Sequence, residues 1–160
     1  MGVLRLRMPL HRKLHSRFVR IRQSQSKRKD GNTMKVKGIF VRNTRGVKYA
    51  DALVRGYKAC ETRNRNTLSS LAGERVAVIR TGGKETMVIG YITFGLGIKT
   101  PYEYFDMQRD MHLVPPGSKY DCKPNGFKWL YFLSDWQTCE PYPLPKAATR
   151  HGRVWCEWEE

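Results

Sequence analysis

The chain has 160 residues, of which 30 are Lys or Arg and 14 are Asp or Glu, so its formal net charge at pH 7 is +16. This length fits one ordinary domain, and the 40% of hydrophobic residues can form a packed core, which excludes a wholly disordered chain, a collagen and a coiled coil. The longest apolar runs, such as residues 76–79, are far shorter than the roughly 20 residues of a membrane-spanning helix, so we expect a soluble, cytoplasmic protein. The excess positive charge favours a polyanionic partner, and nucleic acid is the commonest one in a cell.

The cysteines indicate free thiols rather than a metal site or disulfides. The four residues, Cys60, Cys122, Cys139 and Cys156, do not form the close pairs that zinc sites use. The first 13 residues carry four basic side chains where the apolar segment of a secretory signal would lie. We therefore expect a reducing compartment, no metal and no cofactor.

The positive charge is concentrated at the N-terminus. Residues 1–33 contain ten basic residues and one acidic residue, whereas the remaining 127 residues contain 20 basic and 13 acidic residues. This change predicts a boundary between a basic arm, 1–33, and a domain, 34–160. Apolar residues recur in the arm at the spacing of an amphipathic helix. Three interpretations stay open: a partly helical or disordered arm that lies on nucleic acid or an anionic membrane, an organellar transit peptide, or a segment upstream of a true start at Met34.

The first part of the domain is predicted to be a strand, a helix and a second strand. Residues 35–41 are typical of a strand. Thr44 is a suitable N-cap for a helix, and Gly56 is the residue type that commonly ends one. A short strand is expected at 58–62, followed by a polar loop or a single helical turn at 63–70.

The middle of the domain is predicted to be a hairpin and a short helix. Residues 75–80 and 86–94 are rich in β-branched and apolar side chains, and Gly82 and Gly83 between them favour a tight turn. Residues 101–109 begin with a proline and have the spacing of a short helix.

The last part combines a long loop with two further strands. Residues 110–125 are predicted to be a loop, and 127–133 and 152–158 to be strands separated by a proline-rich turn at 140–145. Many short strands with two or three short helices predict an α+β fold that forms a small closed or nearly closed β-barrel, preceded by the basic arm.

The most informative segment lies between the predicted helix and the second strand. Residues 56–64 read GYKACETRN and resemble the G-x-K-x-x-E-x-R signature of the ASCH domains, a family with a PUA-like β-barrel fold related to RNA-binding modules. Other segments resemble the strands and the proline turn of that family, in the same order: 73–78, 90–94, 129–135 and 140–145. The resemblance covers roughly residues 35–158 and implies a PUA-like domain that binds RNA or a modified nucleotide.

The side chains of this motif have groups that bind nucleic acid. Lys58 can reach a phosphate, Arg63 has a planar fork that suits a phosphate or a guanine edge, and Asn64 can read an adenine edge. Glu61 can accept a hydrogen bond from a base, orient Arg63, or act as a general base if burial raises its pKa. From the residues alone, a structural ion pair between Glu61 and Arg63 or Lys58 is the alternative. With the resemblance, we expect a ligand cleft lined by these four residues.

Aromatic and basic residues outside the motif extend the predicted site. Trp129 and Tyr131 fall on one face of the predicted strand 127–133, with Leu130 and Phe132 as the core pair on the other face. The two outer rings either stack on bases in the cleft or pack beneath the long loop. The predicted nucleic-acid-binding residues are Lys58, Glu61, Arg63, Asn64, Arg65, Trp129 and Tyr131.

Hydrolysis of RNA or of a nucleoside in the same cleft is the alternative function. Some small bacterial ASCH proteins are amidohydrolases that act on acetylated cytidine nucleosides, with a threonine nucleophile three residues after the motif lysine. That position is Glu61 here, and Thr62 points to the opposite side of an extended strand, so this activity is not expected. A ribonuclease would use Lys58 and Glu61, with His112 as a further candidate acid or base. A third possibility is a small interaction protein in which the ion pair of the motif is purely structural.

Overall fold

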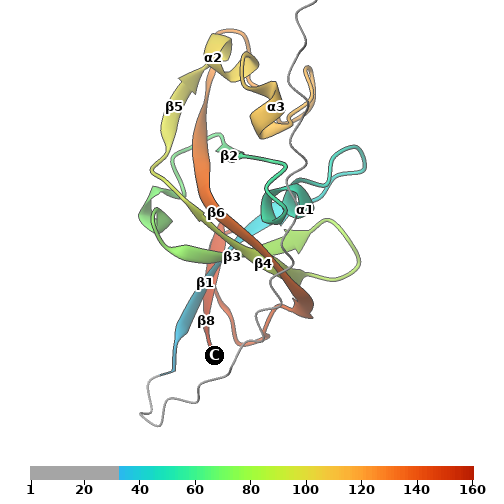
Figure 1. The fold of residues 1–160 in the computed structure, drawn as a ribbon, viewed down its shortest axis with the longest axis vertical. Coiled ribbons are helices and arrows are strands. Elements are labelled where there is room, and N and C mark those ends of the chain that lie inside the picture. Colours follow the sequence, from blue (N-terminus) through green and yellow to red (C-terminus); the bar gives the residue numbers. More distant parts are fainter. Residues whose placement is uncertain (1–32) are drawn as a thin grey trace, which may run out of the picture. The chain divides into compact units, whose positions relative to one another are not determined.

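An eight-stranded sheet is organised around one long strand, β6 (Phe127–Pro143), which runs through most of the domain in Figure 1. The computed structural model describes residues 33–160, so the predictions for the basic arm lie outside the described residues. The first part of β6 pairs with β2 (Cys60–Arg63) on one side and with β5 (Ile98–Pro101) on the other. Its second part pairs with β4 (Met87–Phe94). One strand therefore joins the segment that carries the motif to the rest of the sheet.

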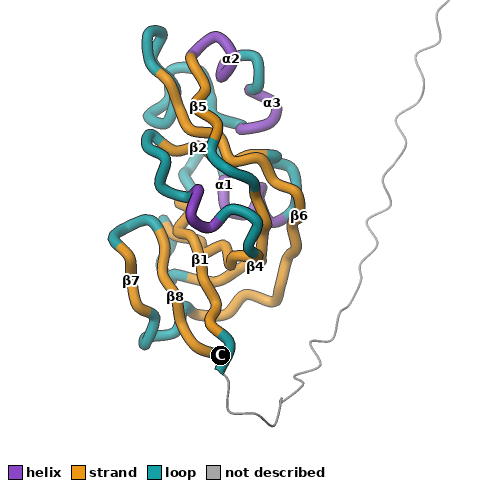
Figure 2. Tube along the Cα trace, turned by 90° about the vertical axis from the view of Figure 1, so that its left-hand side faces the viewer, coloured by secondary structure: helices purple, strands orange, loops and turns teal. Residues whose placement is uncertain are grey.

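The remaining strands extend the sheet beyond β4 in the order β3, β1, β8 and β7. Their bounds are Arg75–Thr81 for β3, Lys35–Arg42 for β1, Trp155–Glu159 for β8 and Thr149–His151 for β7. β1 and β3 pair in parallel, which requires a crossover connection, and this connection contains α1 (Tyr49–Val54) and the short 3-10 turn η1 (Ser69–Leu71). In Figure 2, β7 and β8 lie at one end of the domain, and α2 (Tyr102–Asp106) and α3 (Arg109–His112) lie at the other.

The central strands are buried on both faces of the sheet. In β3, Val76 and Val78 pack into one apolar cluster with α1, whereas Ala77 and Ile79 pack into a second cluster with Trp158 on the other side. A strand covered on both faces has a continuous apolar sequence rather than an alternating one, which is why 75–80 is so strongly strand-like. No helix among residues 33–160 has the length and apolar character needed to cross a bilayer.

The predicted strands at 35–41, 75–80 and 86–94 are confirmed, and the segment expected to be a loop or a helical turn, 63–70, leads into the 3-10 turn η1 at Ser69–Leu71. The helix expected from Thr44 begins only at Tyr49, because the Thr44 hydroxyl accepts a hydrogen bond from Val47 N (3.0 Å) and closes a separate turn. The strand β5 was not predicted, since its four residues follow a glycine-rich stretch and have no alternating pattern.

Two predictions for the C-terminal part were wrong. The segment 140–145 is not a turn, because β6 continues to Pro143; Pro141 lies where the pairing with β4 shifts register, and Pro143 is the last residue of the strand, so neither disrupts a regular ladder. The closed barrel is not observed either. The ladder of the described domain runs from β2 to β7 without joining its ends, and β7 has only three residues, all exposed.

Gly56 is the residue that turns the chain from α1 towards the motif. Its φ angle is +75°, in the left-handed region that favours glycine, and the next residue, Tyr57, donates its N–H to Ala52 O at 2.9 Å. A Cβ atom on Gly56 would lie 2.4 Å from the ring of Trp136 in β6. The first glycine of the motif is therefore required both by its backbone conformation and by the indole ring packed against it.

We predict that Gly56→Ala lowers the free energy of unfolding by about 2–4 kcal/mol, the sum of the left-handed backbone cost and overpacking against Trp136. Gly73→Ala is the matched control, because Gly73 has a similar φ of +79° with nothing within 4 Å of its would-be Cβ. The control should lose only about 1–2 kcal/mol in urea denaturation. Equal losses in the two variants would show that the Trp136 contact is unimportant.

Candidate functional site

A cleft of about 750 Å³ contains the four central residues of the motif. Lys58, Glu61, Arg63 and Asn64 all line it. The other walls come from β1, α1, β6, β7 and the loop 113–122 that follows α3. Segments far apart in the sequence thus meet around the motif.

Lys58 is buried at the base of this arrangement, with 1% of its surface exposed. Its Nζ donates a hydrogen bond to the carbonyl oxygen of His112 at 2.7 Å and lies 5.4 Å from the centre of the Tyr49 ring. Burial lowers the pKa of Lys58, and the nearby Glu61 carboxylate opposes this effect. The ammonium group is therefore held by one carbonyl and one aromatic face, and the Glu61 carboxylate stabilises its charge at longer range.

Glu61 and Arg63 leave two polar atoms without partners. Glu61 Oε1 accepts from Thr62 N at 3.0 Å and lies 3.7 Å from Arg63 Nε, and Arg63 Nη2 donates to Phe40 O at 2.8 Å. Glu61 Oε2 and Arg63 Nε are buried and have no hydrogen-bond partner within residues 33–160. The site thus has one unused hydrogen-bond acceptor and one unused donor. Each buried polar group without a partner lowers the stability of the folded domain by about 1–3 kcal/mol.

Several cleft residues were not predicted from the sequence. Lys128, at the start of β6, is 8% exposed, and its ammonium group donates to Asn64 Oδ1; burial lowers its pKa. Arg150 places its guanidinium 4.8 Å from the centre of the Phe40 ring, and Arg153 lines the same wall. Lys128 directly precedes Trp129, a predicted site residue, so its place in the predicted strand 127–133 could have indicated a position at the cleft. Nothing in the sequence around Arg150 and Arg153 indicates such a position, because only the pairing of β8 with β1 brings their segment to the cleft.

Three predicted site residues do not line the cleft. Tyr131 is fully buried in the core, where its hydroxyl bonds Asn66 Oδ1 at 2.9 Å and accepts from Leu68 N at 3.2 Å. Trp129 is half-buried and packs against the same core, opposite Arg63 in the β2–β6 pairing. Arg65 is exposed outside the cleft. Because this part of β6 is covered on both faces, Leu130 and Tyr131 are both buried and the expected division into a core face and a ligand face fails.

The aromatic residues of the cleft come from other elements. Phe40 lies in β1, Tyr49 at the start of α1 and Tyr120 in the loop 113–122. The rings of Tyr49 and Tyr120 meet edge to face, with 5.8 Å between their centres and 86° between their planes. Sequence reasoning missed this group because its three members are separated along the chain and each fits an ordinary structural role.

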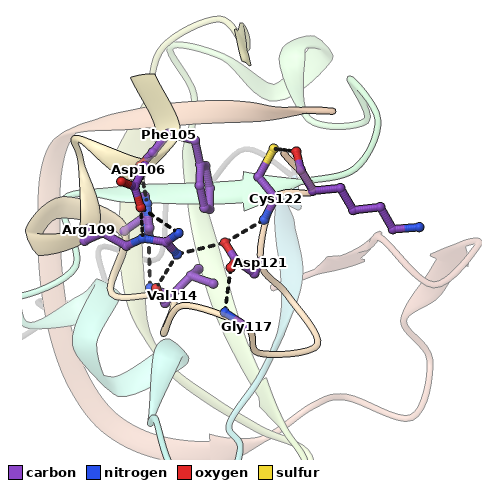
Figure 3. A network of polar contacts seen from close by, with 9 residues as sticks. Phe105, Asp106, Arg109, Val114, Gly117, Asp121 and Cys122 are labelled. Carbon is purple, nitrogen blue, oxygen red and sulfur yellow. Dashed lines mark hydrogen bonds and ion pairs between the residues drawn. The ribbon is translucent and has the colours of Figure 1, made fainter. Parts of the chain in front are cut away.

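The loop that carries Tyr120 is held by Arg109, as Figure 3 shows. The Arg109 guanidinium binds Asp106 (2.9 Å) and Asp121 (2.8 Å) and donates to Val114 O at 3.0 Å. The other Asp121 oxygen accepts from Gly117 N at 2.7 Å. Burial alone would raise the pKa of Asp121, but these hydrogen bonds hold it below its ordinary value. The loop is thereby fixed as one wall of the cleft.

His112 belongs to the structural support and not to the surface of the cleft. It is fully buried in α3, where the prediction placed it in a loop. Its ring stacks on Phe105 at 3.9 Å, Nε2 donates to Phe105 O at 2.8 Å, and Nδ1 accepts from Val114 N at 2.9 Å. These bonds define one neutral tautomer, and burial lowers the pKa of the ring. The candidate acid or base therefore has both ring nitrogens engaged by backbone groups.

The cysteines are free thiols. Cys60, Cys122 and Cys156 are buried and Cys139 is half-buried. Burial raises the pKa of Cys60 and of Cys156 to about 11, so these thiols are poor nucleophiles near neutral pH. Residues 33–160 contain no group of three or more His, Cys, Asp or Glu residues arranged to hold a metal ion.

Comparison with solved structures identifies proteins of similar fold. No family model and no curated protein matches the sequence. A serine-to-alanine variant of the ASCH protein from Zymomonas mobilis is similar in structure, with a TM-score of 0.58, 17% identity, and coverage of 74% of this chain and 85% of that one. The described domain has the ASCH fold. A tyrosine-to-phenylalanine variant and the Z. mobilis ASCH protein itself give TM-scores of 0.54 and 0.53, each at 18% identity and 67% coverage of this chain, with 76% and 73% of their own lengths covered.

The predicted ASCH-like fold is thus confirmed, and the resemblance of residues 56–64 to the ASCH signature stays a prediction. In this ASCH-fold domain the segment consists of the turn after α1 and the strand β2. The glycine makes the turn, the lysine is buried, and the glutamate and arginine lie on the strand that borders the cleft.

We predict that the burial of His112 makes the domain less stable at mildly acidic pH. An exposed histidine has a pKa of about 6.5, and the folded His112 has a lower one, so below about pH 6.5 the unfolded chain binds a proton that the folded chain does not. Stability should fall as the pH falls, by at most about 1.4 kcal/mol per pH unit from this residue. Urea denaturation between about pH 7.5 and about pH 5.5 should give a smaller slope for His112→Gln than for the wild type; identical slopes would contradict this assignment.

Proposed function

We propose that this ASCH-fold domain binds RNA or a modified nucleotide in the cleft around Lys58, Glu61, Arg63 and Asn64. The observation that carries the proposal is the pair of unpartnered atoms, Glu61 Oε2 and Arg63 Nε, on two side chains that line the cleft. Each side chain has one backbone hydrogen bond, and the 3.7 Å ion pair between Glu61 Oε1 and Arg63 Nε keeps the acceptor and the donor side by side. The cost of leaving these atoms unpaired is recovered when a ligand pairs with both.

An acceptor beside a donor suits the edge of a nucleobase. Each base has an N–H donor next to an acceptor on its edge, such as the amino group and ring nitrogen of adenine or cytosine. Glu61 would accept from the base and Arg63 would donate to it. Hydrogen bonds to charged partners are roughly twice as strong as neutral ones, which favours this orientation in a largely buried site.

The other walls of the cleft suit the sugar-phosphate and the face of the base. Arg150 and Arg153 are exposed basic residues at the rim, and neither forms an ion pair within the described domain. Arg and Lys side chains of this kind make most contacts to phosphate. The half-buried ring of Tyr120 supplies apolar surface on which a base can stack, an interaction of about 1–3 kcal/mol.

We predict that the full chain binds a short fluorescent single-stranded RNA and that the affinity falls steeply with salt. Glu61→Gln should raise Kd about five- to tenfold, because a neutral amide replaces the charged acceptor. Lys58→Met should raise Kd about tenfold and lower the free energy of unfolding by about 1–3 kcal/mol, because the His112 carbonyl loses its buried donor and Glu61 loses the nearby positive charge.

Lys146→Ala is the control, because Lys146 is exposed and lies outside the cleft. Fluorescence anisotropy gives the affinities and urea denaturation the stabilities. Absence of salt-sensitive RNA binding would refute the proposal. A Glu61→Gln variant that is less stable but binds RNA as before would instead support the structural ion pair.

The second candidate function is hydrolysis of RNA or of a nucleoside in the same cleft. One observation favours it: Lys58 and Glu61 are both ionisable and buried beside a cleft, and burial lowers the pKa of Lys58 towards the range of a general base. Buried groups beside a cleft whose pKa is shifted, as that of Lys58 is, occur preferentially at active sites and also in structural ion-pair networks.

We predict that, if the domain is a hydrolase, Lys58→Ala and Glu61→Gln each reduce turnover at least 100-fold, the usual contribution of a general acid or base. The assay incubates the protein with single-stranded RNA and with acetylated nucleosides and resolves the products by chromatography. Lys146→Ala should keep full activity. No turnover of either substrate by the wild type, together with RNA binding, would identify a binding protein.

A further inference from the structure

A second hollow adjoins the cleft and shares part of its wall. It has a volume of about 590 Å³, and Arg42, Tyr49 and Tyr120 line both spaces. Its other walls are the connection between β1 and α1, residues 43–48, and the loop 113–122. Any chain-like ligand that leaves the cleft past Tyr120 enters this hollow.

The hollow is lined by basic side chains without acidic partners. Arg42, Arg45, Lys48 and Lys119 all line it and all are exposed. None of them forms an ion pair within residues 33–160, whereas Arg80 and Arg109 outside the hollow do. No acidic residue lines the hollow. Like charges that face one hollow repel each other, so an anion placed there is attracted by all of them.

The residues that line the cleft and the hollow account for the excess positive charge of the domain. Residues 34–160 contain 20 basic and 13 acidic residues. The cleft and the hollow together contain nine of these basic residues and one of these acidic residues, Glu61. The rest of the domain therefore has 11 basic and 12 acidic residues and is almost neutral. The positive excess is confined to one continuous surface.

Hydrogen bonds fix both walls of the hollow. In the connection 43–48, Val47 N donates to the Thr44 hydroxyl at 3.0 Å, and Ala50 N donates to Asn43 Oδ1 at 2.9 Å. On the opposite wall, Asp121 accepts from Gly117 N at 2.7 Å and binds Arg109. The basic side chains are therefore presented by ordered backbone, and a ligand need not order these loops on binding.

We propose that this hollow binds the phosphodiester backbone of a single-stranded RNA whose neighbouring nucleotide lies in the cleft. The ligand of the domain is then an oligonucleotide and not a free nucleotide, an inference that rests on the proposed function of the cleft. Tyr120 stands at the junction of the two spaces, with its ring edge-to-face against Tyr49, where a base can stack as the strand passes. Phosphate groups contact the basic side chains of the hollow, and these contacts carry no base specificity.

The test compares a ribonucleoside 5′-monophosphate with an octaribonucleotide by isothermal titration calorimetry. The full chain is used throughout, because its basic residues 1–33 are then identical in every variant and cancel in the comparison. The variant Arg45→Ala with Lys119→Ala removes two charges of the hollow, and neither residue lines the cleft. The control, Lys123→Ala with Lys146→Ala, removes two exposed charges outside both spaces.

We expect the hollow variant to bind the octamer at least tenfold more weakly and the monophosphate as the wild type does. The slope of log K against log salt for the octamer should become shallower by about 1.4, the value for two phosphate contacts to single-stranded RNA. The control should change neither affinity by more than about twofold. Equal octamer affinity in the hollow variant and the wild type would overturn the proposal and leave the cleft as a mononucleotide site.

Two further outcomes separate this proposal from the one on which it rests. If Lys58→Met weakens monophosphate binding but the hollow variant binds the octamer normally, the cleft binds a nucleotide and only the proposal that the hollow binds the RNA backbone is wrong. If neither RNA ligand binds, the function of the cleft itself is wrong. A poly-aspartate peptide of matched charge serves as the third ligand, and equal weakening of its binding by the hollow variant would show a general anion surface and overturn the assignment to RNA.

Discussion

The ammonium group of Lys58 is buried between the end of α1 and the helix α3. The elements around the cleft supply its hydrogen bond and the opposite charge. Transfer of such a charge out of water costs several kcal/mol unless hydrogen bonds and opposite charge compensate. The His112 carbonyl supplies the hydrogen bond at 2.7 Å, and Glu61 supplies the charge. The carbonyl is in place because the His112 ring is bonded to Phe105 and Val114. This contact, together with the hydrogen bond from Ala59 N to Met111 O at 2.8 Å, ties α3 to the motif.

The long strand β6 connects this polar arrangement to the apolar core. It pairs with β2, which carries Glu61 and Arg63, and further along with β4, whose neighbours form the centre of the sheet. Trp136 of β6 packs on Gly56 at the end of α1 and limits how that turn can be made. A change in the packing of β6 is thus transmitted both to the turn before Lys58 and to the strand after it.

The cleft combines features that lower stability with features that attract a ligand. Buried Lys58, the unpartnered oxygen of Glu61 and the unpartnered N–H of Arg63 each cost folding free energy. Exposed basic residues without partners continue from the cleft into the adjoining hollow. Such local costs persist where a surrounding structure supports them, and here the Arg109 network and the β2–β6 pairing provide that support. A ligand with polar base edges and a negatively charged backbone would reverse several of these costs together.

The sequence by itself determined the central strands, the glycine turn and the motif, because strand periodicity, the need for glycine at a positive φ and a short signature are all local. It predicted that Lys58, Glu61, Arg63 and Asn64 line one cleft, and the structure brings these four together. Only the tertiary structure decided that Tyr131 is buried, that β6 extends through its prolines and that the sheet stays open. It also decided which further residues complete the cleft: Tyr120, Lys128, Arg150 and Arg153. These outcomes depend on which segments pair across long separations and on which faces those pairings cover, and local pattern does not contain that information.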